Sequence, residues 1–185
     1  MDKILYTLIV YSENIAGVLN QITAVFTRRQ VNIESLNVSA SSTQGVHKYT
    51  ITAMSDEDTI SMITKQIGKK IEVLQANYYT DENVFILETA LYKISTSNLL
   101  ENKNISKVVR MHNAMIVEVN PTYAIVEKTG MTDEIISLYE GLKEYDCVIQ
   151  FVRSGRIAIT KGSVERLDAY IADREAKYLA SKKND

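Results

Sequence analysis

Two asparagines and a glycine flank one apolar helical stretch near the start of the chain. Asn14 and Gly17 come just before this stretch, and Asn32 comes just after it. The first N–H groups of a helix lack partners within the helix, and its positive end favours a carboxylate. Glycine also lets a ligand approach the backbone closely. These residue types at this spacing could bind a ligand.

Apolar side chains accompany these polar groups along the sequence. Ile15, Val18, Ile33 and Leu36 are placed to surround an aliphatic group, and Asn32 could reach the same region from a neighbouring copy. A small aliphatic amino acid fits this set of groups. Its carboxylate would meet N–H groups, its ammonium would meet carboxamide or carbonyl oxygens, and its branched chain would lie among apolar residues.

A purely structural interpretation explains the same residues. Asparagine is a good N-cap, so Asn14 could cap the helix. Asparagine also tolerates the left-handed conformation, so Asn32 could form the turn that follows the helix. The residues alone leave both interpretations open.

Motifs for catalysis and metal binding are missing from the sequence. It contains no G-x-G-x-x-G, G-x-x-x-x-G-K-[ST], H-E-x-x-H or C-x-x-C motif. His47 and His112 have no cysteine or carboxylate at ligand spacing, so we expect surface or hydrogen-bonded histidines and no metal site. Cys147 adjoins an apolar run, which predicts a buried structural thiol and a reducing compartment.

Charge and composition argue against nucleic acid and membrane partners. The formal net charge of the 185 residues is −2, with both signs interspersed. An RNA-binding domain with the order β-α-β-β-α-β would carry aromatic residues in its third strand. The third predicted strand here, residues 46–54, has one aromatic residue and no glycine. No apolar run reaches about 18 residues, and no signal peptide is recognisable. We expect a cytoplasmic protein that binds a protein or a small molecule.

The hydrophobic pattern occurs twice along the chain. In each half an apolar strand is followed by a helix, two strands, a second helix and a final strand, which predicts two ferredoxin-like α+β domains of about 75 residues each. In the first half Ser55 and Asp58 resemble a capping box, and in the second half Thr132 is a good N-cap. The predicted strands are 3–11, 33–40, 46–54, 71–78, 84–94, 114–119, 123–129, 147–153 and 157–160, and the predicted helices include 17–29 and a more weakly patterned one at 98–110.

We therefore predict three parts of the chain. Residues 1–79 form an effector-binding domain, residues 84–161 form the second ferredoxin-like domain, and residues 162–185 form a helical tail. A tail that packs on the protein is preferred to a docking peptide.

Short motifs resemble one known family. Residues 14–19, N-I-A-G-V-L, resemble the N-x-x-G-x-L loop of ACT domains, which sense amino acids in biosynthetic enzymes. Residues 32–36, N-I-E-S-L, are similar to the same segment in the regulatory small subunit of acetolactate (acetohydroxyacid) synthase. Residues 153–155, R-S-G, are similar to a segment near the end of that family's second domain. The resemblance covers about residues 3–161.

The resemblance implies a regulatory subunit without catalytic residues. Such a subunit would bind the catalytic large subunit, raise its activity and confer feedback inhibition by valine or a related branched-chain amino acid. It would carry no cofactor, since thiamine diphosphate, Mg²⁺ and FAD are expected on the large subunit. Two ACT domains would pair as a homodimer through their sheets, with the effector at that interface. The implied effector residues are Asn14, Ile15, Ala16, Gly17 and Val18 of one copy, and Asn32 and Ile33 of the other.

Two positions depart from the family pattern. Gln30 stands where the family usually has the glycine that ends the helix, so we expect this helix to end without a left-handed glycine. Ala16 replaces a common serine or proline. A free-standing ACT-type sensor that controls a transcription or signalling partner remains the alternative function, and an enzyme is a third.

Overall fold

The computed structural model describes residues 3–162, 167, 171 and 172. Most of the predicted tail therefore lies outside the described residues. The chain forms two compact units, one made of the described residues of Met1–Phe85 and Ala158–Asp185 and the other of Ile86–Ile157. None of the helices in the described part combines the length and the apolar character that a membrane crossing requires.

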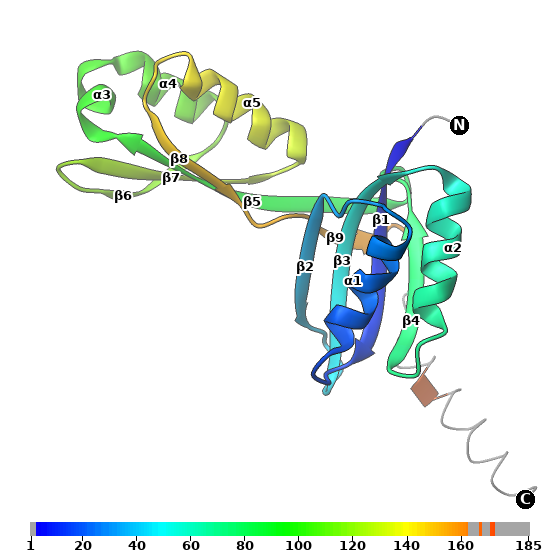
Figure 1. Cartoon of the computed structure of the whole chain (residues 1–185). Helices are drawn as coiled ribbons and strands as arrows, with labels where there is room; N and C mark the ends of the chain where they lie inside the picture. The colour runs from blue at the N-terminus through cyan, green and yellow to red at the C-terminus, as the bar shows by residue number, and fades with distance from the viewer. Residues whose placement is uncertain (1–2, 163–166, 168–170, 173–185) are drawn as a thin grey trace, which may run out of the picture. The chain divides into compact units, whose positions relative to one another are not determined.

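The first unit is a four-stranded antiparallel sheet with two helices on one face (Figure 1). The strand order is β2-β3-β1-β4. Apolar residues recur every three or four positions in both helices, so each helix packs one side on the sheet. The core between helices and sheet includes Leu8, Ile22, Phe26, Ile51 and Ile63. The elements are β1 Ile4–Glu13, α1 Val18–Arg28, β2 Ser35–Ala40, β3 Val46–Ser55, α2 Glu57–Gly68 and β4 Val73–Tyr79.

The second unit repeats this arrangement with the strand order β6-β7-β5-β8. Tyr92 and Ile94 on β5 lie in its core, and the thiol of Cys147 is buried there as predicted. The two units confirm the predicted α+β class and the repeated β-α-β-β-α-β order. The elements are β5 Val84–Ser95, α3 Thr96–Glu101, α4 Lys103–Met111, β6 Met115–Val119, β7 Tyr123–Gly130, α5 Thr132–Lys143 and β8 Val148–Arg153.

The starts of three helices differ from the prediction. The residue that caps α2 is Asp56 and not Ser55, since the Asp56 carboxylate accepts the N–H of Thr59 at 2.9 Å. The predicted helix 98–110 is two helices, because Asn102 ends α3 and caps α4. Met131 rather than Thr132 precedes α5, and Glu134 accepts the Met131 N–H at 2.9 Å.

Three helices end on a left-handed residue that is not glycine. Gln30 follows α1 with a φ of 54°, Asn113 follows α4 with a φ of 51°, and Asp146 follows α5 with a φ of 48°. The residue after α1 therefore adopts the left-handed conformation even though it is glutamine and not the usual glycine. The conformation costs more for glutamine than for glycine.

The short strand β9, Ile157–Thr160, returns to the start of β5. Ala158 in this strand is buried, and its carbonyl oxygen accepts the ammonium of Lys48 on β3 at 2.8 Å. The ammonium of Lys161 donates to the carbonyl oxygens of Asp81 and Glu82. These two contacts of residues 158–161 are with residues of the first unit. The predicted domain boundaries, 1–79 and 84–161, stay a prediction.

Candidate functional site

The N-terminus of α1 is open and has no side-chain cap. Gly17 precedes the helix with a φ of 92°, in the left-handed region, and no side chain caps the N–H groups. The backbone N–H groups of Ala16, Gly17, Leu19 and Asn20 make no hydrogen bond to any described residue. Four donors at the positive end of a helix favour an anionic group such as a carboxylate.

Asn14 and Ile15 border these free N–H groups. The backbone of Asn14 is fixed, since its N–H donates to the carbonyl oxygen of Gly45 at 2.9 Å. The Asn14 carboxamide is exposed and makes no hydrogen bond within the described part of the chain, so the interpretation of Asn14 as a helix cap is wrong. Ile15 is 52% exposed, whereas the side chain of Val18 is buried in the core.

Asn32 and Ile33 lie beyond the opposite end of the same helix. The 11 residues of α1 separate them from the Asn14 loop, a length of about 16 Å. Asn32 is exposed, its side chain forms no hydrogen bond with a described residue, and its φ is not positive. The interpretation of Asn32 as the left-handed turn residue is therefore wrong, since Gln30 has this role. One copy of the chain does not bring the two predicted halves of the site together.

Strand β2 leads away from Asn32 and forms one edge of the sheet. It pairs with β3 on one side and has no partner strand among the described residues on the other. Ser35 is fixed at its start, since its hydroxyl is hydrogen-bonded to that of Thr52 on β3 at 2.6 Å. A free edge with backbone N–H and C=O groups can pair with another strand.

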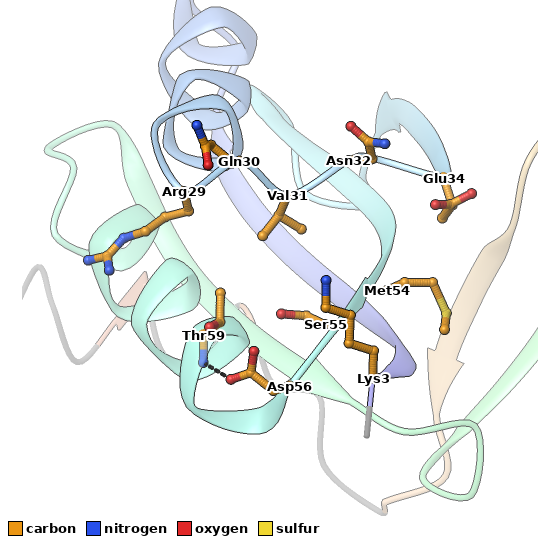
Figure 2. Close-up of a pocket in the computed structure, with 10 residues that line it drawn as sticks. All are labelled: Lys3, Arg29, Gln30, Val31, Asn32, Glu34, Met54, Ser55, Asp56 and Thr59. Carbon is orange, nitrogen blue, oxygen red and sulfur yellow. Dashed lines mark hydrogen bonds between the residues drawn. The ribbon is translucent and has the colours of Figure 1, made fainter. Parts of the chain in front are cut away.

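A pocket of about 270 Å³ lies on the Asn32 side of the first unit (Figure 2). It is bounded by the start of β1, the end of α1, the connection to β2, and the junction of β3 with α2. Hydrogen bonds from Thr59 hold the pKa of the Asp56 carboxyl below its usual range. The sequence pattern does not reveal this pocket, because its groups come from four separate segments. The lining residues are Lys3, Arg29, Gln30, Val31, Asn32, Glu34, Met54, Ser55, Asp56 and Thr59.

The R-S-G segment of the second unit is held by a buried carboxylate. Glu88 on β5 is only 3% exposed, accepts the hydroxyl of Thr132 and lies 3.5 Å from the guanidinium of Arg153. Ser154 is fixed to Thr89, since its N–H donates to the Thr89 carbonyl oxygen at 2.9 Å. Glu88 was not among the predicted site residues. Its place in the alternating pattern of buried residues on β5 is the signal that could have found it, since a buried carboxylate needs a partner.

His112 has structural surroundings. His112 contacts the carbonyl oxygen of Val108 at 3.0 Å and the hydroxyl of Ser137 at 3.2 Å through its two ring nitrogens. Within residues 3–162, 167, 171 and 172, no three His, Cys, Asp or Glu side chains form a group that could hold a metal ion.

The fold and the open helix end define a class of protein. The first unit is an ACT domain, and a second ferredoxin-like domain follows it. Residues 8–75 match the family model described as the acetohydroxyacid synthase small subunit-like ACT domain, and residues 87–162 match the model described as the small subunit of acetolactate synthase. The chain belongs to the family of regulatory small subunits of acetolactate synthase.

Relatives in three organisms support this assignment. The acetolactate synthase small subunit of Bacillus subtilis is 32% identical over 154 residues, which is 83% of this chain and 88% of that protein. The probable small subunit of Methanothermobacter thermautotrophicus is 30% identical over 82% of this chain and 89% of its own. The crystal structure of the Thermotoga maritima small subunit matches with a TM-score of 0.77 at 27% identity, over 87% of this chain and 99% of that one.

Proposed function

We propose that the chain binds the catalytic large subunit of acetolactate synthase, raises its activity and makes it sensitive to valine or a related branched-chain amino acid. The names of its relatives as small subunits support a large-subunit partner. In this proposal the chain carries no cofactor, and thiamine diphosphate, Mg²⁺ and FAD belong to the large subunit.

The observation that carries the effector proposal is the unsatisfied start of α1. Four free N–H groups there can receive the amino acid carboxylate, and the exposed carboxamide of Asn14 lies in the same loop. The exposed Ile15 offers apolar contact to a branched side chain. Because the fold uses none of these groups, a ligand can bind them without breaking an existing contact.

The second half of the proposed site comes from a neighbouring copy. Asn32 and Ile33 lie about 16 Å from the Asn14 loop of their own chain, and they adjoin the free edge of β2. A homodimer that pairs through this edge would offer them to the partner's loop. A ligand that contacts both copies binds the dimer more tightly than a single copy, and this difference in affinity stabilises the dimer. Such coupling is ordinarily about 1–3 kcal/mol.

Co-purification with the candidate large subunit tests the proposal. We expect a stable complex that forms acetolactate from pyruvate faster than the large subunit alone, with inhibition by at least one of valine, leucine and isoleucine. A large subunit that neither binds the chain nor responds to it would reject this function and favour a free-standing sensor of another partner. Turnover of pyruvate by the purified chain alone would make it an enzyme.

A further inference from the structure

The pocket on the Asn32 side of the first unit is lined by a hydroxyl that bonds no described residue. Ser55 is 2% exposed, and its hydroxyl makes no hydrogen bond to any described residue. Figure 2 shows this hydroxyl directed into the pocket. Thr52 bonds Ser35 at 2.6 Å, and Thr64 donates to the Ile60 carbonyl oxygen at 2.9 Å, whereas in the described part Thr7 Oγ1 is enclosed without a partner. The Ser55 hydroxyl is instead open to the pocket, so it can donate to water or to a ligand there.

A lysine ammonium faces the same space. Lys3 forms no ion pair or hydrogen bond with a described residue, and its side chain extends across the pocket toward Ser55 and Val31 (Figure 2). The guanidinium of Arg29 instead points away and lies 3.6 Å from the sulfur of Met62. An ammonium and a hydroxyl that converge on one space are hydrogen-bond donors for an anionic oxygen.

The surroundings limit the charge that this space accepts. The 12-residue helix α2 begins at the pocket, which adds a positive end to the ammonium of Lys3. Asp56 already uses its carboxylate to cap α2 through Thr59, and the carboxylate of Glu34 points away from the centre of the pocket. With the carboxylates of Asp56 and Glu34 at the rim and the Lys3 ammonium as the cation that the described residues direct inward, a single negative charge suits the site better than two.

The remaining walls leave little room for an apolar body on the ligand. Val31 points into the pocket beside the polar groups, whereas the side chain of Met54 turns away from Lys3 and Ser55 (Figure 2). A volume of about 270 Å³ is just below the usual range for ligand pockets, which begins near 300 Å³. We propose that this pocket binds a small monocarboxylate, with its carboxylate on Lys3 and Ser55 and its short hydrocarbon part against Val31.

This site is separate from the proposed effector site at the start of α1. The two sites lie at opposite ends of that helix and share only Asn32, which is at the rim of the pocket. The described residues that line the pocket all belong to one copy of the chain, whereas the proposed effector site draws on two. The monocarboxylate proposal therefore does not depend on the proposed function.

Titration of the full chain with sodium isobutyrate tests the proposal. We expect saturable binding by calorimetry, with amide shifts in ¹⁵N spectra at residues around Ser55 and Thr59. Isobutyramide has the same shape without the charge, and we expect it not to bind. Equal binding of the amide, or no saturation by isobutyrate at tens of millimolar, would overturn the proposal.

Variants assign the binding to the pocket. Ser55→Ala and Lys3→Met should each weaken isobutyrate binding about tenfold, since each removes a hydrogen bond to a charged group. Lys65→Met removes the same charge from an exposed position on α2 and should leave binding unchanged. Asn14→Ala should weaken valine binding and spare isobutyrate. If isobutyrate binding instead depends on Asn14 and not on Lys3, the probe occupies the start of α1 and the pocket proposal fails.

Discussion

Asn14 is the residue whose role a single substitution tests most directly. Its carboxamide makes no hydrogen bond in the described part of the chain, so Asn14→Ala should change the free energy of unfolding by less than about 0.5 kcal/mol. A hydrogen bond to a charged ligand group is worth about 1.5–3 kcal/mol, so valine binding should weaken about 10- to 100-fold. Scanning calorimetry measures the stability, and titration calorimetry measures valine binding. Gln66→Ala, on the exposed side of α2, is the control for both measurements. Unchanged valine binding in Asn14→Ala would reject the site.

Gln30 should be a position where glycine stabilises the protein. Its φ of 54° costs an L-residue about 1–2 kcal/mol, and glycine avoids this cost at a larger loss of entropy on folding. We expect Gln30→Gly to raise the free energy of unfolding by about 0.5–1 kcal/mol, measured by urea unfolding. In the helical position of Gln66 the same change should destabilise by about 1 kcal/mol. Destabilisation in both variants would contradict the strain at Gln30.

The sequence could identify these residues but not their conformations. Asn14 and Gly17 were predicted to flank the helix start, and they do. Asparagine is the commoner left-handed residue, so the structural interpretation places the turn at Asn32, whereas Gln30 adopts the left-handed conformation. Tertiary packing of the residues after α1 decides which residue turns, and local preference does not carry that information.

The start of α2 should depend on the ionisation of Asp56. Because the folded pKa of its carboxyl is lowered, the ionised form stabilises the fold at pH values above the unfolded pKa of about 3.9. This contribution is lost as the pH falls through the lowered folded pKa. We expect the thermal midpoint of Asp56→Asn, which keeps a capping oxygen, to fall less than that of the wild type between neutral pH and about pH 2. An equal fall in both proteins would mean that Asp56 contributes nothing to the acid sensitivity.

The Glu88 cluster joins three elements of the second unit. Arg153 on β8 forms an ion pair with the buried Glu88 carboxylate at 3.5 Å, and Thr132 at the start of α5 donates its hydroxyl to the same carboxylate. Arg153→Met keeps the length of the side chain and removes the charge. We expect the free energy of unfolding to fall by about 1–3 kcal/mol, measured with urea, and to recover in part in Arg153→Lys. An unchanged stability in Arg153→Met would mean that Thr132 alone satisfies Glu88.

Most elements were predictable because the hydrophobic pattern carries their period. Alternating and three- or four-residue spacing predicted the strands and the main helices, and the structure confirms their order. The break between α3 and α4 was missed, since the apolar positions run on through Asn102 and only its capping contact with Asn104 reveals the boundary. The capping residues before α2 and α5 were each misplaced by one position, which is within the ordinary uncertainty of helix ends.

At the scale of the whole molecule, one chain holds two incomplete halves of the proposed effector site. The Asn14 loop and Asn32 lie at opposite ends of α1, so no movement of side chains alone can bring them onto one small ligand. The sequence pattern predicted the two halves, but only the family resemblance suggested that a second copy joins them. The effector proposal therefore predicts a link between valine binding and dimerisation.

Valine should strengthen the homodimer if both copies contact it. A ligand that binds only the paired state stabilises it by about 2.7 kcal/mol at 100 times its Kd, which is about a 100-fold change in the dimer dissociation constant for each ligand. Sedimentation velocity across a range of protein concentrations, with and without valine, measures this change. In Asn14→Ala the same valine concentration should shift the equilibrium less, because fewer sites are filled. Valine that binds with normal affinity and leaves the dimer dissociation constant unchanged would place the whole site within one copy, and Asn32 would then have no part in it.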